Sequence, residues 1–176
     1  MTETFDGESI ARQRIAEEAE RRTGFLDLSQ LGLTELPAEL FTLRHLRCLK
    51  LGWRLTVKDG VLVTAGWNNP PNRLGENLGA LAALPHLEAL SVCQTDCASL
   101  DFLALLDRLK WLDCSNTQVS SLGPLAKLTD LQFLDCKSTK ISELGPLAKL
   151  TALQSIRCRS TQFSDLSLLA TLTGLQ

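Results

Sequence analysis

A period of 22 residues runs through the second half of the sequence and constrains its fold more than any other feature. Three ladders of identical residues share this spacing: Leu87, Leu109, Leu131, Leu153 and Leu175; Thr95, Thr117, Thr139 and Thr161; and Cys114, Cys136 and Cys158. Several parallel ladders of one period indicate that structural units repeat along the chain. A unit this short cannot bury its apolar residues alone, so successive units must stack on one another.

Each unit combines two hydrophobic spacings. In the unit that begins at Leu131, apolar and polar residues alternate near Leu134 and Cys136, which predicts a short strand with one buried face. The leucines that follow are spaced by three residues, and Pro124 and Pro146 interrupt helical hydrogen bonding in two of these segments. We therefore predict a 3₁₀-like or extended return segment, and strands that align into one parallel sheet.

The unit L-x-x-L-x-C-x-x-T-x-[VIF]-S-x-L-x-x-L-A-x-L resembles the leucine-rich-repeat family, whose signature is L-x-x-L-x-L-x-x-N/C-x-L. The segments S-x-L-G-P-L-A-K-L-T are similar to the 22-residue repeats of bacterial internalin-like proteins. The resemblance implies an α/β fold, a right-handed leucine-rich-repeat solenoid (horseshoe) with a parallel sheet on its concave face. Threonine stands where the family usually has asparagine, and its hydroxyl offers one hydrogen-bond donor fewer.

About six repeats are expected over residues 23–176. Four regular units, 87–108, 109–130, 131–152 and 153–174, follow two divergent ones, 23–45 and 46–86. Residues 1–22 precede them and contain a predicted helix, Ser9–Arg22, whose stripe of Ala11, Ile15 and Ala19 can cover the open end of the first coil as a capping helix. Gln176 lies two residues into a further unit, so we expect the natural protein to continue.

The second repeat is 41 residues long and therefore carries an insertion, roughly residues 54–73. Asp59-Gly60 lies between two β-rich runs, which predicts a β-hairpin that pairs Lys58 with Val61. Trp53 and Trp67 are expected to meet near the base of this hairpin. Two interpretations remain open: the hairpin is a second contact surface, or it is a flap that shields the divergent second coil.

The six cysteines are predicted to be free thiols. Cys114, Cys136 and Cys158 occupy the strand position normally held by leucine, and Cys97 takes another inward position, whereas Cys48 and Cys93 fall at outward positions. Neither C-x-x-C nor His-containing metal spacing is present, so no metal site is expected. Free thiols fit a reducing cytoplasm.

Charge and motifs argue against several classes of function. The net charge is −2, with 18 basic and 20 acidic side chains and no Lys/Arg run, so we expect neither nucleic acid nor a membrane surface as a partner. The start lacks a secretory signal, and no stretch of 18 apolar residues occurs, which favours the cytoplasm. Phosphate loops, G-x-S-x-G and H-E-x-x-H are absent, so we predict no enzymatic activity and no cofactor.

The outward strand positions should form continuous rows on the concave face, because neighbouring strands lie about 4.8 Å apart. Trp111 and Phe133 are then adjacent exposed aromatics in a charged surround, which is the usual composition of a binding hot spot. The alternative is a solvated sheet face with cross-strand aromatic packing. The predicted partner-binding residues are Lys50, Trp53, Trp67, Trp111, Asp113, Phe133, Asp135, Lys137, Arg157 and Arg159.

The helix A-R-Q-R-I-A-E-E-A, the unit L-T-E-L-P, the inserted tryptophans and the L-D-C-S-N-T-Q-V-S units resemble the amino-terminal region of large bacterial leucine-rich-repeat proteins. Some of these are Roco-type proteins, which carry a Ras-like GTPase and a dimerisation domain downstream. The resemblance implies a recognition or regulatory arm of a larger signalling protein that binds a protein partner. A stand-alone adaptor, a secreted bacterial effector that acts on host proteins, and a structural spacer are the alternatives.

Overall fold

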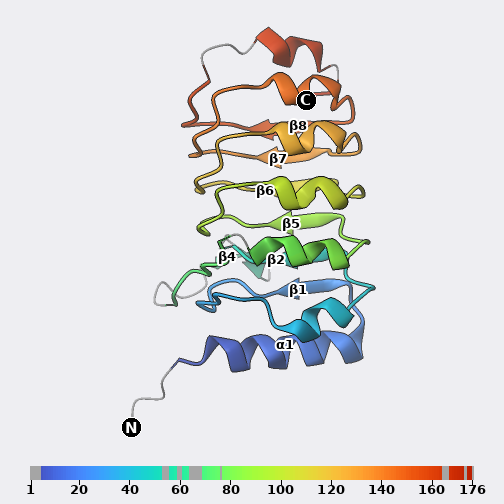
Figure 1. Ribbon diagram of the computed structural model, residues 1–176, viewed down its shortest axis with the longest axis vertical. Coiled ribbons are helices and arrows are strands. Elements are labelled where there is room, and N and C mark those ends of the chain that lie inside the picture. Colours follow the sequence, from blue (N-terminus) through green and yellow to red (C-terminus); the bar gives the residue numbers. More distant parts are fainter. Residues whose placement is uncertain are drawn as a thin grey trace.

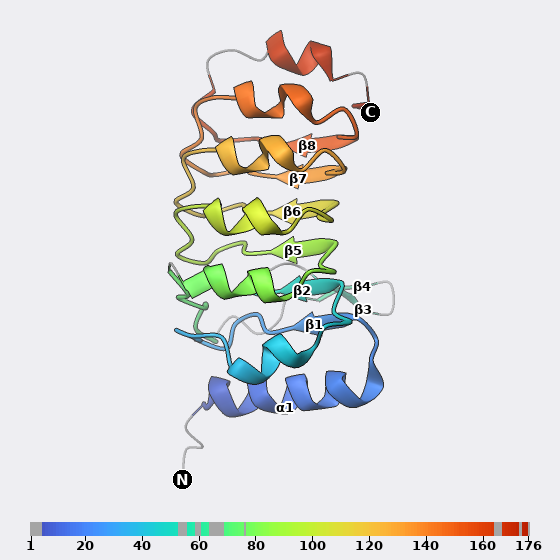
Figure 2. The ribbon, with the colours of Figure 1, turned by 45° about the vertical axis from the view of Figure 1, so that its right-hand side comes forward.

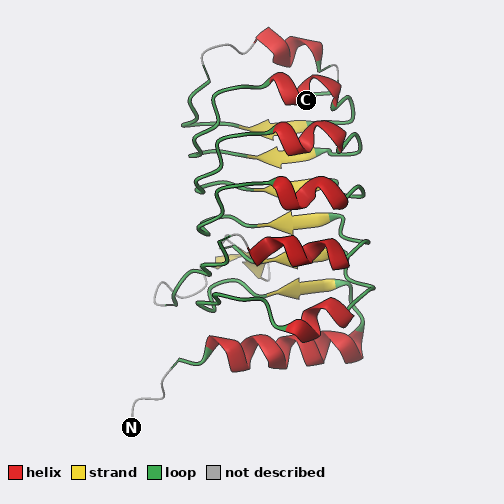
Figure 3. Ribbon diagram, in the orientation of Figure 1, coloured by secondary structure: helices red, strands yellow, loops and turns green. Residues whose placement is uncertain are grey.

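The computed structural model describes residues 5–52, 56–58, 61–63, 69–75, 77–163, 167–172 and 174–175. The chain forms a stack of coils with one end at the N-terminus and the other near the C-terminus (Figure 1). Each coil places a short strand on one side and a 3₁₀ helix on the other, which gives two layers (Figures 2 and 3).

The described residues contain one parallel sheet of six strands in the order β1-β2-β5-β6-β7-β8. The strands are β1 Phe25–Asp27, β2 Cys48–Lys50, β5 Ala89–Ser91, β6 Trp111–Asp113, β7 Phe133–Asp135 and β8 Ser155–Arg157. Each predicted repeat contributes one strand, and the register pairs equivalent positions of successive repeats, as in Leu112 with Leu134. The parallel sheet that the periodicity predicts is confirmed. The strand of the fifth repeat begins at Phe133, one residue before the Leu134–Cys136 alternation.

The return segments are short 3₁₀ helices. They are η1 Ala38–Thr42, η2 Asn77–Ala83, η3 Asp101–Leu105, η4 Gly123–Lys127, η5 Gly145–Lys149 and η6 Ser167–Thr171. Three residues per turn place Leu122, Leu125 and Leu128 on the same buried side. Pro124 and Pro146 lie in the first turns of η4 and η5, where a missing N–H costs no helical hydrogen bond. The prolines therefore begin these helices and do not interrupt them.

One hydrophobic core runs through all the coils, from Ala11 to Leu172. Cys114 and Cys136 are fully buried in it, as predicted, whereas Cys158 is half-buried. The threonine ladder bonds within each coil: the hydroxyl of Thr117 donates to the Cys114 carbonyl at 2.6 Å, and Thr139 bonds Cys136 in the same way. Cross-coil bonds at this edge come from the backbone, as from the Asn116 N–H to the Lys137 carbonyl. Threonine thus closes turns but does not link coils.

Helix α1, Gly7–Arg21, lies beside β1 and η1 at the N-terminal end of the stack (Figure 1). It begins after Asp6, whose side chain accepts the N–H of Ser9 at 3.0 Å. Ala11 and Ile15 are buried against the core, but Ala19 is exposed, so the predicted third member of the apolar stripe is wrong. Glu18, which is three residues after Ile15, occupies that side of the helix.

Glu18 is buried because its carboxylate is fully engaged. It accepts the Gly24 N–H at 2.7 Å and the Thr23 hydroxyl, and His45 Nε2 lies 2.9 Å away. These partners precede β1 and follow η1, so one side chain joins the helix to the first coil. A buried carboxylate is tolerated only with such hydrogen bonds.

Lowering the pH should weaken the contact that Glu18 makes between α1 and the first coil. Burial by itself raises the pKa of Glu18, but hydrogen bonds from Thr23, Gly24 and His45 outweigh it and leave the pKa below its ordinary value. A carboxyl group with a depressed folded pKa stabilises the fold above its unfolded pKa and loses this contribution as pH falls through the folded pKa. In urea titrations, the difference in unfolding free energy between wild type and Glu18→Gln should be constant above about pH 5.5 and shrink at lower pH.

The control for this titration is Glu17→Gln, on the exposed side of the same helix. This variant should follow the wild-type profile. A Glu18→Gln difference that stays constant down to about pH 3 would show that the Glu18 carboxylate adds no pH-dependent stability.

The insertion contains an antiparallel pair, β3 Thr56–Lys58 and β4 Val61–Val63, in which Lys58 pairs with Val61. Trp53 and Trp67 lie outside the described residues. The described chain resumes at residue 69, and Asn72 is buried. Its Oδ1 accepts the N–H of Leu31 and of Leu33, at 3.3 and 2.9 Å, and its Nδ2 donates to the carbonyls of Leu28 and Leu51 at 2.7 and 2.8 Å.

Asn72 therefore links the first coil to the second through contacts about 40 residues apart in sequence. From the sequence, Asn72 was predicted only as part of the insertion, roughly residues 54–73. The missed signal is Asn72-Arg-Leu74, which restores the N-x-L end of the repeat signature after the insertion. A buried asparagine that satisfies backbone groups on two coils is a structural residue.

Candidate functional site

Two aromatic side chains lie next to each other on the face of the sheet that points away from the core. We call this the outer face, and the first and third residues of each strand are directed toward it. Trp111 of β6 and Phe133 of β7 are register partners, their ring centroids are 5.2 Å apart, and their planes differ by 6°. The guanidinium carbon of Arg157, on β8, lies 5.4 Å from the Phe133 ring centroid. This cation–π contact extends the row to a third strand. We call Trp111, Phe133 and Arg157 the aromatic stack.

The stack is only half-buried, as its aromatic members retain solvent contact. Aromatic pairs of this kind contribute about 0.5–1.5 kcal/mol beyond the area they bury, so each ring is held in place by its neighbour. A rigid and partly exposed aromatic surface loses little conformational entropy when a partner packs on it. The predicted adjacency of this pair is confirmed, because a 22-residue offset equals one coil, but the two rings are half-buried where exposure was predicted.

Three basic residues adjoin the stack on the last two described strands and the turns after them. Lys137 Nζ and Arg157 Nη1 lie 3.5 and 3.9 Å from Asp135 Oδ2, and their side chains are 40% and 55% exposed. Arg159 is exposed two residues beyond Arg157. We call Lys137, Arg157 and Arg159 the basic cluster. The structure thus brings together five of the predicted partner-binding residues.

Asp113 and Asp135 were predicted to flank the aromatics at the surface, and this prediction is wrong. Both side chains are 0% exposed. Asp113 Oδ1 accepts the N–H and the hydroxyl of Ser115 at 3.0 and 2.6 Å, and Asp135 Oδ1 accepts the Lys137 N–H at 3.2 Å. An aspartate that bonds the backbone two residues on stabilises a tight turn. These carboxylates therefore shape the ends of the strands.

Lys50 belongs to the same row but is held inside the protein. Its ammonium lies 2.8 Å from Asp27 Oδ2, and its side chain is largely buried. Asp27 also accepts the Ser29 N–H at 2.9 Å, so the first coil repeats the aspartate turn of the later ones. A largely buried and paired lysine stabilises the contact between β1 and β2 and does not contribute to a binding surface.

Cys93 was predicted at an outward position and is buried. The hydroxyl of Ser115 lies 3.3 Å from its sulfur, and Gly52 packs directly against its backbone. Burial, with the nearby negative charge of Asp113, raises the pKa of the Cys93 thiol. Burial likewise raises the pKa of Cys97 to about 11 and that of Cys136 to about 12. All six cysteines are free, and these three are protonated thiols at neutral pH.

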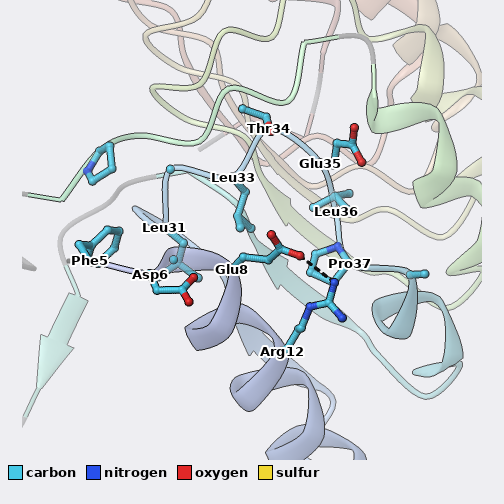
Figure 4. A pocket seen from close by; sticks show the side chains of 14 residues that line it. Phe5, Asp6, Glu8, Arg12, Leu31, Leu33, Thr34, Glu35, Leu36 and Pro37 are labelled. Carbon is cyan, nitrogen blue, oxygen red and sulfur yellow. Dashed lines mark hydrogen bonds and ion pairs between the residues drawn. The ribbon is translucent and has the colours of Figure 1, made fainter. Parts of the chain in front are cut away.

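A separate hollow of about 780 Å³ lies between the start of α1 and residues 31–38 (Figure 4). It is at the opposite end of the stack from the basic cluster. Arg12 crosses it and binds Glu8 at 2.7 Å and Glu39 at 2.9 Å. Phe5 lies at its margin and is exposed. The hollow is open, and its cation Arg12 is already paired with Glu8 and Glu39, so it offers little for the recognition of a ligand.

No metal-binding group of three or more His, Cys, Asp or Glu residues is found within the described part of the chain. Among the same residues, no helix is both long enough and apolar enough to span a bilayer.

Residues 107–149 match the family described as Leucine Rich repeats (2 copies). Together with the six-stranded parallel sheet, this match decides the architecture. The fold is a leucine-rich-repeat solenoid. No curated protein matches the sequence.

Solved structures of bacterial leucine-rich-repeat proteins share this solenoid. An internalin, InlF, from Listeria monocytogenes is 22% identical with a TM-score of 0.66, over 97% of this chain and 52% of the internalin. A leucine-rich-repeat protein from Leptospira interrogans is 20% identical with a TM-score of 0.72, over 100% of this chain and 40% of that one. This chain therefore spans about half of the internalin and a smaller share of the leptospiral protein.

The functional domain of InlJ from Listeria monocytogenes, described as including a cysteine ladder, is 20% identical with a TM-score of 0.55, over 86% of this chain and 31% of that chain. The present solenoid also stacks cysteines, since Cys114, Cys136 and Cys158 occupy one position of successive coils. At these identities the likeness shows the fold alone.

Proposed function

We propose that this solenoid is a protein–protein interaction module that binds a protein partner on the outer face of its sheet, with the aromatic stack at the centre of the contact. The single observation that carries the proposal is the pair of large aromatic rings, Trp111 and Phe133, held half-exposed on a regular sheet. Aromatic and arginine side chains supply most of the binding energy in protein interfaces. The proposed role is non-catalytic and uses no cofactor.

In the proposed arrangement the coils form a right-handed horseshoe, and the sheet lines its concave face. Residues 1–22 act as the N-terminal cap, and residues 23–176 form the solenoid. The cap role is supported by Ala11 and Ile15, which enter the core of the first coil. The β3–β4 pair is either a second contact surface or a cover for the second coil.

The proposed context is the recognition or regulatory arm of a larger cytoplasmic signalling protein, of Roco type or a related architecture. A second candidate is a stand-alone adaptor or secreted bacterial effector, which the similarity of the S-x-L-G-P-L-A-K-L-T segments to internalin-like repeats favours. The flanking sequence of the natural protein distinguishes the two contexts. A GTPase phosphate loop downstream of Gln176 supports the signalling arm, and a secretion signal upstream supports the effector.

A pull-down with purified protein tests the choice of surface. We expect the wild type to recover a specific partner from lysate of the source cells and Trp111→Ala/Phe133→Ala to recover at least about tenfold less, because a hot-spot residue is worth about 2 kcal/mol or more. Thermal melting of both proteins checks that the variant is folded.

The matched control is Leu105→Ala, which removes a 69% exposed apolar side chain on η3, in the helical layer. It should recover the partner as the wild type does. Equal recovery by the folded Trp111→Ala/Phe133→Ala variant would rule out the aromatic stack as the binding site.

A further inference from the structure

The carboxylates that pair with lysine and arginine side chains are partly exposed beside the earlier coils and buried beside the later ones. Lys50 lies 2.8 Å from Asp27, and Lys110 lies 2.9 Å from Glu88, which also pairs with Arg47 at 3.6 Å. These cations of the earlier coils have close partners on their own protein. The carboxylates of Asp27 and Glu88 are about one-third exposed, so an acidic ligand that approaches these cations meets negative charge at the surface.

The carboxylate of the basic cluster is placed differently. Lys137 and Arg157 share Asp135 at 3.5 and 3.9 Å, and this carboxylate is fully buried while the cations are about half-exposed. Arg159 makes no ion pair with any described residue and is exposed. Asp135 also accepts the backbone N–H of Lys137, so part of its hydrogen-bonding capacity is used by the turn. A net positive surface therefore adjoins the aromatic stack.

The geometry of the cluster suits a carboxylate ligand. The guanidinium carbon of Arg157 lies 5.4 Å from the Phe133 ring centroid and the side chain is 55% exposed, so its N–H donors are accessible to a planar, bidentate acceptor. Arg157 ends β8, and Arg159 lies two residues on, where its carbonyl still accepts the Ser138 N–H of the neighbouring coil; two residues of such a chain span about 7 Å. That spacing equals the distance between alternate side chains of an extended peptide.

We infer that the partner presents an acidic segment to this end of the sheet, with carboxylates at alternate positions binding the basic cluster and an apolar side chain packing on Trp111 and Phe133. This inference rests on the proposed function and narrows it to a partner of defined charge. Nucleic acid is the other anionic candidate partner. Because the cluster has few cations and the net charge of the protein is −2, binding of nucleic acid would release few counterions.

Selection from a display library of random 12-residue peptides tests the inference. The peptides enriched on the wild-type protein should contain Asp or Glu at alternate positions together with an apolar or aromatic residue. Synthetic labelled copies should bind in fluorescence polarisation, and copies with Gln and Asn in place of Glu and Asp should bind at least about tenfold more weakly. Raising salt from about 50 to 500 mM should weaken binding of the acidic form only.

Two double variants with the same change in charge provide the comparison. Arg157→Glu/Arg159→Glu should lose at least about tenfold in affinity for the selected acidic peptide. Lys127→Glu/Lys149→Glu, on the exposed sides of η4 and η5, should bind it as the wild type does. Equal losses in both variants would reduce the effect to overall charge and overturn the inference.

The remaining outcomes separate this inference from the proposed function. Enriched peptides that are neutral or basic, yet lose binding in Trp111→Ala/Phe133→Ala, would overturn the acidic partner and leave the aromatic stack as the binding site. Peptides that bind without dependence on Trp111 and Phe133 would overturn both, as would a library that yields none. Tighter binding of a labelled thymidine 12-mer than of the best peptide would assign the surface to nucleic acid.

Discussion

Replacing Asn72 with alanine should lower the free energy of unfolding by about 4 kcal/mol, since four buried backbone groups lose a partner at about 1 kcal/mol or more each. The groups are the N–H of Leu31 and Leu33 and the carbonyls of Leu28 and Leu51. The side chain is 1% exposed, so water has no direct access to replace it. The change also cuts a connection between the first and second coils, which the insertion separates in sequence.

Urea denaturation followed by circular dichroism measures this loss, and hydrogen exchange should show faster exchange at the amides of Leu31 and Leu33. Asn77→Ala is the matched control, because Asn77 makes an exposed bond to the Thr34 carbonyl at 3.2 Å. We expect the control to cost less than about 1 kcal/mol. A loss for Asn72→Ala no larger than that of the control would show that the coils do not depend on this asparagine.

Replacing Gly52 with alanine should also cost about 3 kcal/mol or more, because overpacking against backbone cannot be relieved by a change of rotamer. A Cβ atom at Gly52 would lie 2.0 Å from the carbonyl oxygen of Cys93 and 2.2 Å from its nitrogen. Gly52 follows β2 and its N–H bonds the Ser91 carbonyl at 3.1 Å, so β2 and β5 must separate to admit a methyl group. The variant should therefore also expose the Cys93 thiol.

Thermal and urea unfolding test the stability, and the rate of thiol modification by a maleimide tests the exposure of Cys93. Gly145→Ala is the control, since a Cβ there meets nothing within 4 Å. It should be neutral or stabilising by about 0.4–1 kcal/mol. Equal stability of Gly52→Ala and the control, with Cys93 still unreactive, would mean that β2 and β5 need not separate to admit a methyl group.

The candidate site was partly accessible to sequence reasoning. The pairing of Trp111 with Phe133 and the placement of Lys137, Arg157 and Arg159 on the same surface follow from the repeat, because residues 22 apart occupy equivalent positions of adjacent coils. Alternation alone, however, treats every outward position as exposed. Asp113 and Asp135 are buried because the turn two residues on bonds to them, and the pattern of apolar residues carries no sign of that bond.

The 22-residue period is sufficient to derive the solenoid: one strand per repeat, an unshifted parallel register, and leucines and cysteines directed inward. A local period is enough for this, since each coil contacts only its neighbours. Only the tertiary structure shows what individual polar side chains do. Glu18 joins α1 to the first coil, and Asn72 joins two coils. Their partners lie in other segments, and the contact between segments sets whether a polar group is buried and satisfied or left for a partner.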